Sequence, residues 1–386
     1  MELSIKEEWN YPSEHFSTLA LSTFPMEQFI TSWRMTAQDA DLVQTSVPIP
    51  ELKPGEALVK IAGCGVCHTD LGFWHDGVKT KHPLPLTLGH EISGTVIALT
   101  PSLSPGERGN LVGKSVIIPA VLPCGECDLC KSARSNICRN QKMPGNDFDG
   151  GFASHIIVPA RFLCPVPEEL LHHHDLATLS VIADAVATPY QAVKKSGLVR
   201  DDFVIAIGVG GVGIYGALIA QIFGGKVLAI DINDERLKSA SEMGIPATLN
   251  VAGLDLKAIK NKVREIAERF GTRPNGWKIF EFSGTKAGQE LAFNLMSYAS
   301  TVSIVGFTMD KIEVRLSNLM AFDATMIGTW ACKPELYPEI LDLFAEGKLS
   351  VEPFVQVFPL ESINQIFHDT LAHKYTKRTV LIPNDN

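Results

Sequence analysis

Phe203-Val-Ile-Ala-Ile-Gly-Val-Gly-Gly-Val-Gly213 is the stretch of sequence that decides the fold of this chain. Its first five residues form a continuous apolar run, as expected of a strand that is buried on both faces of a sheet. A glycine-rich turn comes next, and a helix-like stretch then continues to Phe223. A strand, a glycine turn and a helix in this order predict a dinucleotide-binding unit.

The residues that follow repeat the alternation of strand and helix. Residues 226–230 predict the next strand, and residues 235–243 predict the next helix. Further strands are expected at residues 278–282 and 301–305. Alternating elements of this kind imply a parallel, doubly wound α/β sheet.

The glycine turn has the composition of a pyrophosphate-binding loop. Glycines permit a tight turn and let backbone N–H groups approach the phosphates, while the helix N-terminus faces their charge. Asp231 ends the next strand, and its carboxylate would accept hydrogen bonds from the adenosine ribose and repel a 2′-phosphate. The pattern therefore predicts NAD rather than NADP. The residues expected to hold this cofactor are Gly208, Gly210, Gly211, Val212, Gly213, Asp231 and, over the adenine side, Arg236.

The first half of the chain has a different texture, with short β-branched stretches bounded by proline and glycine. Strands are expected near residues 57–62, 92–97, 116–118 and 154–158. Dense proline and glycine punctuation is typical of an irregular antiparallel barrel. Residues 1–30 have few periodic apolar positions, and we expect an N-terminal extension there.

Length and composition limit the classes of function. A chain of 386 residues exceeds one ordinary core, so we expect two domains. The formal net charge of −9 argues against a nucleic-acid or anionic-membrane partner, and no apolar run is long enough to span a bilayer. The polar N-terminus lacks the apolar segment of a secretory signal. Eight cysteines, four of them clustered, favour thiolate ligands in a reducing compartment, so we expect a cytoplasmic enzyme.

A metal-site spacing, Cys-x2-Cys-x2-Cys-x7-Cys, joins four cysteines of the first half: Cys124, Cys127, Cys130 and Cys138. Four thiolates close the tetrahedral shell of a structural zinc by themselves, with sulfur ligands at about 2.3 Å. We expect this zinc to stabilise a lobe of about 15 residues that has little core of its own.

A second group of potential ligands is chemically different. Gly63-Cys-Gly-Val-Cys-His-Thr-Asp70 is followed by Gly89-His-Glu91, and the best ligand candidates in it are Cys67 and His90. Asp70 could orient His90 through its other ring nitrogen. Such a set leaves a coordination position open, which is where zinc performs chemistry. A third protein ligand is required, and no further cysteine stands in an obvious place.

These motifs occur in one order, and together they resemble the zinc-containing medium-chain alcohol dehydrogenases. The resemblance covers nearly all of the chain from Trp33 onward. It implies a GroES-like, β-rich catalytic domain at residues 31–184 and 331–386, and a Rossmann NAD-binding domain at residues 185–330. It also implies NAD as cofactor and two zinc ions per chain, one catalytic and one structural.

The resemblance also implies roles for residues of the catalytic zinc site. Relatives usually take the third ligand from a cysteine just before the cofactor domain, and the matching residue here is Asp184. A carboxylate is a harder ligand, which leaves zinc a stronger Lewis acid. Glu91 is the alternative third ligand, and Thr69 is the hydroxyl expected to take the alcohol proton. Gly72 replaces the relay histidine of many relatives; nearby His75 could substitute, although a surface role fits it better.

Further cofactor contacts follow from the same resemblance. His68 and Arg378 match positions that contact the NAD pyrophosphate in relatives, and both side chains suit phosphate. Val305, Gly306 and Phe307 end a predicted strand near the place where relatives hold the nicotinamide amide through backbone groups.

Two regions of the sequence resemble one particular group of enzymes within this family. Residues 143–147 with 150–155, and residues 306–311 with 315–322, are similar to family members that oxidise the ring hydroxyl of a cyclic acyl-CoA thioester. An acyl-CoA substrate needs cations for its phosphates. The candidates are Lys79, Lys81, Lys131, Arg134, Arg139, Lys142 and Arg161.

Other interpretations stay open at this point. A zinc dehydrogenase of another cyclic or polyol alcohol shares the main motifs, and a non-catalytic NAD-binding protein would need a closed Cys67 site. Relatives are dimers or tetramers, so we expect a homotetramer, with a homodimer as the alternative. The run His172-His-His174 is interpreted as a solvated helix start rather than as a metal site.

Overall fold

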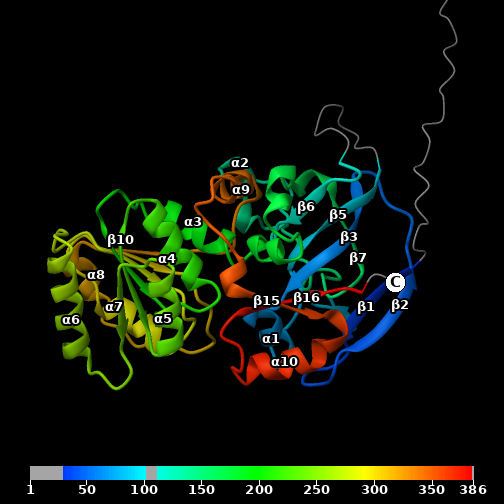
Figure 1. The fold of residues 1–386 in the computed structure, drawn as a ribbon. Helices are drawn as coiled ribbons and strands as arrows, with labels where there is room; N and C mark the ends of the chain where they lie inside the picture. The colour runs from blue at the N-terminus through cyan, green and yellow to red at the C-terminus, as the bar shows by residue number, and fades with distance from the viewer. Residues whose placement is uncertain (1–28, 101–110, 385–386) are drawn as a thin grey trace, which may run out of the picture.

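A computed structural model of the chain describes residues 29–100 and 111–384. It contains two units side by side, with a six-stranded sheet in one and a larger sheet in the other (Figure 1). The extension expected at residues 1–30 lies outside the described residues apart from its last two positions, which begin strand β1 (Phe29–Met35). Among the described residues, no helix is both long and apolar enough to cross a membrane.

The six-stranded sheet is parallel throughout. In sheet order it consists of β11 (Ala247–Asn250), β10 (Lys226–Asp231), β9 (Phe203–Ile207), β12 (Lys278–Glu281), β13 (Thr301–Ile304) and β14 (Thr325–Gly328). All five residues of the central strand β9 are buried. The order reverses between β9 and β12, and dinucleotides bind at the carboxyl ends of strands at such a switch point.

Local sequence explains where the helices of this unit begin. They are α4 (Gly213–Ile222), α5 (Asp234–Glu242), α6 (Leu256–Arg269), α7 (Lys286–Asn294) and α8 (Ser317–Phe322). Asn233, Asp255 and Thr285 cap α5, α6 and α7, since each side chain accepts a hydrogen bond from a backbone N–H of the first turn. The predicted parallel, doubly wound sheet is confirmed, and the strands and helices whose bounds were predicted begin and end within one residue of those bounds.

The larger sheet belongs to the other unit. In sheet order it consists of β15 (Val355–Pro359), β16 (Arg378–Ile382), β3 (Glu56–Gly65), β5 (Glu91–Leu99), β6 (Ser115–Ile118) and β8 (Cys164–Pro165), with β7 (His155–Pro159) also paired to β3. Strand β16 pairs with β3, so the C-terminal segment returns to the first half of the chain. The pair of β15 with β16 is parallel, which departs from the expected antiparallel barrel. A separate small sheet consists of β2 (Val43–Pro48), β1 and β4 (Leu86–Thr87).

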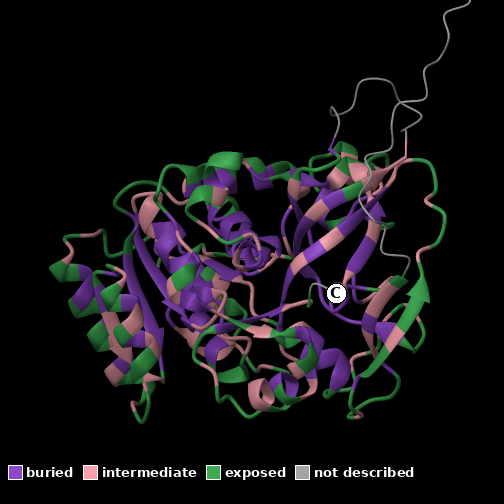
Figure 2. Cartoon of the chain, turned by 45° about the vertical axis from the view of Figure 1, so that its right-hand side comes forward, coloured by how far each residue is buried: buried purple, intermediate pink, exposed green. Residues whose placement is uncertain are grey.

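One hydrophobic core joins the two units. It combines Val204 and Phe280 of the six-stranded sheet with Val380 of β16, Tyr190 of α3 (Ala187–Lys195) and Tyr337 of α9 (Tyr337–Ala345). Figure 2 shows the buried residues concentrated in the sheets and in the helices between them. The remaining helices are α1 (His68–Trp74), α2 (Asp128–Lys131) and α10 (Ile363–Leu371). The shared core holds the two units against each other on either side of the cleft described below.

Candidate active site

Four potential metal ligands from distant parts of the chain meet beside the cleft. Cys67 precedes α1, His90 precedes β5, Glu91 begins β5, and Asp184 follows the helical turn Thr178–Ala183. One ligand atom of each residue lies within 4.8 Å of those of the other three. The Nε2 atom of His90 is 3.7 Å from Oδ2 of Asp184. The structure therefore brings both candidate third ligands together with Cys67 and His90.

Asp70 is fully buried behind these ligands. Its Oδ1 lies 3.3 Å from Nδ1 of His90 and accepts a hydrogen bond from the N–H of Gly89 at 3.0 Å. Its Oδ2 accepts a hydrogen bond from the N–H of Cys67 at 2.9 Å. One carboxylate thus orients both segments, and Nε2 of His90 faces Asp184 on the other side of the ring.

The charges around His90 favour a cation. Burial lowers the pKa of His90, but the carboxylates of Asp70 and Asp184 outweigh burial and raise the pKa well above its ordinary value. The pocket therefore stabilises a positive charge at a buried position. A thiolate, an imidazole nitrogen and a carboxylate oxygen are zinc ligands, so this set of donors fits a zinc ion with one position left open.

Glu91 is bound by Arg378. The Nε atom of Arg378 donates a hydrogen bond to Oε2 of Glu91 at 2.9 Å, and its Nη2 donates to Oε1. Both side chains are almost completely buried, so each charge needs the other. The ion pair engages both carboxylate oxygens of Glu91, whereas Oδ2 of Asp184 is directed at His90. This arrangement favours Asp184 over Glu91 as a metal ligand.

Two threonines lie next to the candidate ligands. The Oγ1 atom of Thr69 is 3.6 Å from Sγ of Cys67, and Thr69 borders the cleft. Thr188 donates a hydrogen bond to Oδ1 of Asp184 at 2.5 Å. The sequence motifs do not reveal Thr188, but its position four residues after Asp184, one helical turn away, is a signal that could have found it.

The other histidines considered from the sequence lie elsewhere. His75 ends α1, and its Nδ1 is 2.5 Å from Oδ1 of Asp39, with both side chains about half exposed. His174 lies 2.5 Å from Glu352 through Nδ1 and Oε1. Neither residue borders the cleft that holds Thr69.

The glycine turn lies at the carboxyl end of β9. Gly208 has a φ of +82°, and a Cβ on Gly213 would lie 1.8 Å from the carbonyl oxygen of Gly208, so both positions require glycine. Asp231 at the end of β10 accepts hydrogen bonds from three backbone N–H groups at 2.8 to 3.0 Å, one of them in the glycine turn. This carboxylate therefore ties the turn to β10 where an adenosine ribose binds in such folds.

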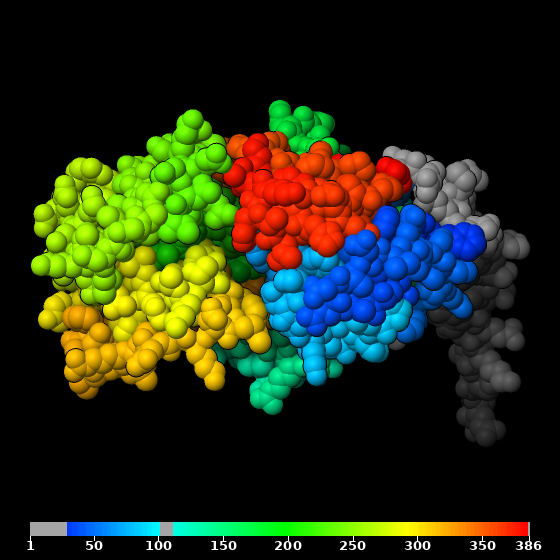
Figure 3. All heavy atoms as spheres, turned by 90° about the horizontal axis from the view of Figure 1, so that it is seen from below, coloured from blue at the N-terminus to red at the C-terminus, as the bar shows by residue number. Residues whose placement is uncertain are grey.

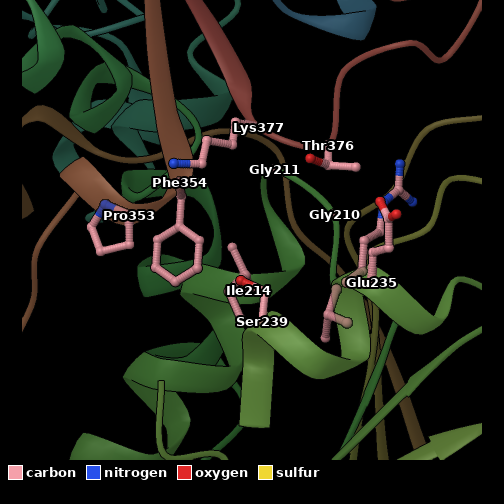
Figure 4. Close-up of a pocket in the computed structure, with 11 residues that line it drawn as sticks. Gly210, Gly211, Ile214, Glu235, Ser239, Pro353, Phe354, Thr376 and Lys377 are labelled. Atoms are coloured by element: carbon pink, nitrogen blue, oxygen red, sulfur yellow. The ribbon is translucent and has the colours of Figure 1, made fainter. Parts of the chain in front are cut away.

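A cavity of about 200 Å³ opens beside this turn. Figure 4 shows Gly210 and Gly211 of the turn near Thr376 and Lys377 of the C-terminal segment. Arg236 also borders the cavity. A cavity between glycine backbone and cationic side chains suits the pyrophosphate of a dinucleotide.

More positive charge gathers at the same place. Arg378 lies against Gly211, since a Cβ there would come within 3.2 Å of Nη1 of the arginine. His68 keeps an exposed edge, but desolvation of its ring by neighbouring atoms, together with the charges of Arg378, His373 and Arg236, lowers its pKa to about 4. His68 is therefore neutral near pH 7, and its ring N–H can donate a hydrogen bond to an anion held by the arginines. The structure thus gathers His68, Arg236 and Arg378 around one candidate phosphate site.

The cleft between the two units has a volume of about 990 Å³. Thr69, His90 and Asp184 border it, and so do Val305 and Phe307 at the end of β13. Figure 3 shows the surface hollowed between the two units. An alcohol near the candidate metal ligands could therefore meet a nicotinamide held at the edge of the six-stranded sheet.

The four sulfur atoms of the cysteine lobe, residues 124–138, also meet at one point. Sγ of Cys124 is 3.4 Å from that of Cys138 and 4.0 Å from that of Cys130, and Cys127 and Cys130 are 3.5 Å apart. Sulfur atoms bound to one zinc at about 2.3 Å lie about 3.8 Å from one another, so the set fits. The backbone N–H groups of Glu126 and Cys127 lower the pKa of Cys124 to about 6, which favours the thiolate.

The cysteine lobe is docked on the segment that follows β14. Ser135 donates a hydrogen bond to Oε2 of Glu335 at 2.8 Å, and Nδ2 of Asn136 donates to the carbonyl oxygen of Trp330 at 2.7 Å. The indole Nε1 of Trp330 donates to Gln141 at 3.2 Å. Residues 132–134, 136 and 137 border the large cleft, so the lobe forms one of its walls.

The chain is similar to known proteins along most of its length. The family model described as the alcohol dehydrogenase GroES-like domain matches residues 53–168, and that of the zinc-binding dehydrogenase matches residues 211–346. An alcohol dehydrogenase of Geobacillus stearothermophilus is 31% identical over 333 residues, which are 86% of this chain and 93% of the relative. Two solved structures cover 92% of this chain and 100% of their own, each with a TM-score of 0.80: the alcohol dehydrogenase of Aeropyrum pernix at 27% identity and galactitol-1-phosphate dehydrogenase of Escherichia coli at 25%.

Proposed function

We propose that this chain, which belongs to the zinc-dependent medium-chain alcohol dehydrogenase family, oxidises a ring secondary alcohol at its Cys67 cluster. The family consists of oxidoreductases that act on CH–OH groups with NAD(P), and the chain is such an enzyme. The observation that carries the proposal is that Cys67, His90 and Asp184 converge beside a cleft that Val305 and Phe307 also border.

The proposed catalytic zinc site consists of Cys67, His90 and Asp184, and the four lobe cysteines form the proposed structural site. Bound at the first site, zinc supplies a Lewis acid that polarises the alcohol oxygen and lowers its pKa. Glu91 acts here as the buried partner of Arg378, because both of its oxygens are engaged. Two zinc ions per chain are therefore expected.

The chain's own residues position the alcohol and its proton. Thr69 would relay the alcohol proton, accepting it and releasing its own hydroxyl proton to solvent in the cleft, since its hydroxyl borders the cleft next to Cys67. Thr188 donates a hydrogen bond to Oδ1 of Asp184, and Oδ2, which faces His90, is therefore the oxygen that is free to bind the zinc ion. Val305 and Phe307 position the nicotinamide. Bound NAD would supply the hydride acceptor, so that loss of a hydride to NAD and of a proton to the protein would convert the alcohol into the ketone and give NADH.

NAD is proposed in preference to NADP. The Asp231 carboxylate stands at the end of β10, where it would accept from the ribose and repel a 2′-phosphate. Nη1 of Arg236 lies 4.0 Å from Oδ2 of Asp231. Arg236 is the cation that a 2′-phosphate would need, and it is already paired with this carboxylate. Initial rates with each dinucleotide test this assignment, and a lower KM for NADP would reject it.

The proposed substrate is 6-hydroxycyclohex-1-ene-1-carbonyl-CoA, with the 6-oxo thioester as product, in anaerobic benzoyl-CoA degradation. Its support is the similarity of residues 143–147, 150–155, 306–311 and 315–322 to the dehydrogenase of that thioester. The alternative is another cyclic or polyol secondary alcohol, because galactitol-1-phosphate dehydrogenase has a similar structure at 25% identity.

NADH formation with a panel of alcohols tests the substrate. We expect kcat/KM for the cyclic CoA thioester to exceed that for cyclohexanol by about 100-fold or more, because only the thioester uses the whole cleft. Equal values for thioester, cyclohexanol and ethanol would contradict an acyl-CoA substrate. A preference for polyols or their phosphates would establish the alternative instead.

We also propose a homotetramer, with a homodimer as the alternative, in the cytoplasm. Strand β14 ends the six-stranded sheet of the described residues, and Met309, Leu316 and Met320 before it are exposed. An open edge beside exposed apolar side chains is a surface that association covers. All eight cysteines are free of disulfides, which fits a reducing compartment. Light scattering that shows a monomer would contradict the oligomer.

A further inference from the structure

We propose that the solvent end of the large cleft is a phosphate-binding site formed by Arg134, Lys195 and Lys333, which we call the cationic rim. The rim receives the phosphate groups of a phosphorylated alcohol while its carbinol lies at the Cys67 cluster. The inference rests on the proposed function, and it names the residues that recognise the part of the substrate remote from the chemistry.

The three cations come from three different segments. Arg134 belongs to the cysteine lobe, Lys195 is the last residue of α3, and Lys333 follows β14. All three border the large cleft together with His90 and Asp184. Arg134 and Lys195 are exposed and Lys333 is half-buried, whereas His90 is 1% exposed. The rim therefore lies where the cleft opens to solvent, and the candidate zinc ligands lie at its buried end.

The cleft differs in charge from the rest of the chain. The chain carries a formal net charge of −9, yet among the described residues that border this cleft there are four lysines and arginines and a single carboxylate, that of Asp184. One of the four, Lys194, has its charge matched by Glu339, to which its Nζ is bound. Within the described residues no carboxylate is in ion-pair contact with Arg134, Lys195 or Lys333, although the charge of Lys333 contributes to lowering the pKa of Glu339.

Two of the rim cations, Arg134 and Lys195, lie close enough to repel each other. The Nζ atom of Lys195 donates a hydrogen bond to the carbonyl oxygen of Gly328 at 2.5 Å, which fixes its position. Partial burial and the charge of Arg134 both lower the pKa of Lys195. The like charges of Arg134 and Lys195 oppose one another, and an anion between them removes that repulsion.

Phosphate is the anion that this arrangement fits. A guanidinium binds two phosphate oxygens at once, and an ammonium adds a point charge. A neutral alcohol would use none of these groups. Two kinds of substrate supply the shared chemistry, namely an acyl-CoA, whose phosphates end a long arm, and a polyol phosphate, and the experiment includes both.

The experiment compares the wild-type enzyme with Arg134→Ala and Lys333→Ala, at saturating NAD. The substrates are the hydroxycyclohexene CoA thioester and the thioester of the same acid with N-acetylcysteamine, which has no phosphate. We expect each variant to raise KM for the CoA thioester about tenfold, with kcat retained, and to leave KM for the N-acetylcysteamine thioester unchanged. The dependence of KM on salt should weaken in parallel.

Lys131→Ala and Arg139→Ala are the matched controls. Lys131 is an exposed cation of the lobe and Arg139 is an exposed cation directly after it, but neither borders the cleft, so KM for the CoA thioester should stay at the wild-type value. An equal increase of KM for both thioesters, or an equal effect of rim and control variants, would overturn the rim.

The outcome separates this inference from the proposed substrate. If the CoA thioester is turned over and the rim variants leave its KM unchanged, the rim is wrong and the substrate stands. If galactitol 1-phosphate but not the CoA thioester is turned over, and the rim variants raise its KM, the rim stands and the acyl-CoA assignment falls. If neither phosphorylated substrate depends on Arg134 or Lys333, the inference is rejected.

Discussion

The two clusters of metal-binding side chains in this molecule are built in opposite ways. The lobe takes four identical donors from residues 124–138, of which three are partly exposed and Cys138 is buried. The Cys67 cluster takes three kinds of donor from segments far apart in the sequence, and Asp70, Thr188 and the Glu91–Arg378 pair surround it. A closed set of donors needs only local spacing. An open set needs neighbouring charges and hydrogen bonds to hold each ligand in place.

The largest expected effect follows from removing a ligand of the open site. Cys67→Ala should lower kcat/KM on the order of 10³-fold or more, since a Lewis acid contributes several kcal/mol to the transition state. Metal analysis should show one zinc per chain instead of two, because the lobe is untouched. Cys332→Ala, a cysteine outside both clusters, is the control and should keep both ions. Full activity of Cys67→Ala would show that the Cys67 cluster is not a catalytic metal site.

The next effect separates the two candidate third ligands. Asp184→Ala should weaken the binding of the catalytic zinc, so that the zinc content falls below two ions per chain, and should reduce kcat/KM by about 10²-fold. Glu91→Gln should keep both zinc ions but leave Arg378 buried without its charge partner, so the free energy of unfolding should fall by about 3–5 kcal/mol. Zinc counts and urea unfolding of both variants provide the measurement. If Glu91→Gln loses zinc and Asp184→Ala does not, Glu91 is the third zinc ligand and Asp184 is not.

A smaller effect is expected from the closed site. Cys130→Ser should release the lobe zinc and loosen the wall that contains Arg134, while the ligands at the other end of the cleft keep their ion. We expect Tm to fall and KM for the CoA thioester to rise about tenfold, with kcat changed little. An unchanged KM after loss of the lobe zinc would mean that the wall holds its shape without the metal.

The smallest effect concerns proton transfer next to the open site. His75 lies in a surface pair with Asp39 and not at the cleft, so His75→Gln should change kcat by less than about twofold. The measurement is kcat of the wild-type enzyme and of His75→Gln as a function of pH, between about pH 6 and about pH 9, the range that includes the ordinary pKa of histidine. A tenfold or larger loss of kcat would show that His75 relays the proton of Thr69 after all.

Local patterns predicted more of this molecule than long-range ones. Strand β9 has the predicted bounds because a buried apolar run followed by glycine has few alternatives. The spacing of the four lobe cysteines was sufficient to place them together. By contrast, no spacing rule connects Cys67, His90 and Asp184, and the third ligand was inferred from family resemblance alone.

The contacts that were missed depend on tertiary structure. Glu91 and Arg378 are 287 residues apart in the sequence, so their pairing follows only from the return of β16 to β3. Lys194 and Lys195 end α3, where lysines are usual because they complement the helix dipole, and nothing local marks them as cleft residues. Of the seven cations proposed from the sequence for an acyl-CoA, only Arg134 borders the cleft.

The docking of the lobe on Trp330 has an evolutionary consequence. The loop between the third and fourth cysteines, residues 131–137, carries most of the lobe's share of the cleft wall, and its ends are fixed by sulfur ligands. Substitutions at the other cleft-bordering positions of this loop, residues 132–134 and 137, can therefore accumulate while Ser135 and Asn136 keep the lobe docked and the ligands at the reacting end stay unchanged. Descendants of such an enzyme can acquire new alcohols by exchanging a seven-residue cassette, without rebuilding the chemistry that oxidises them.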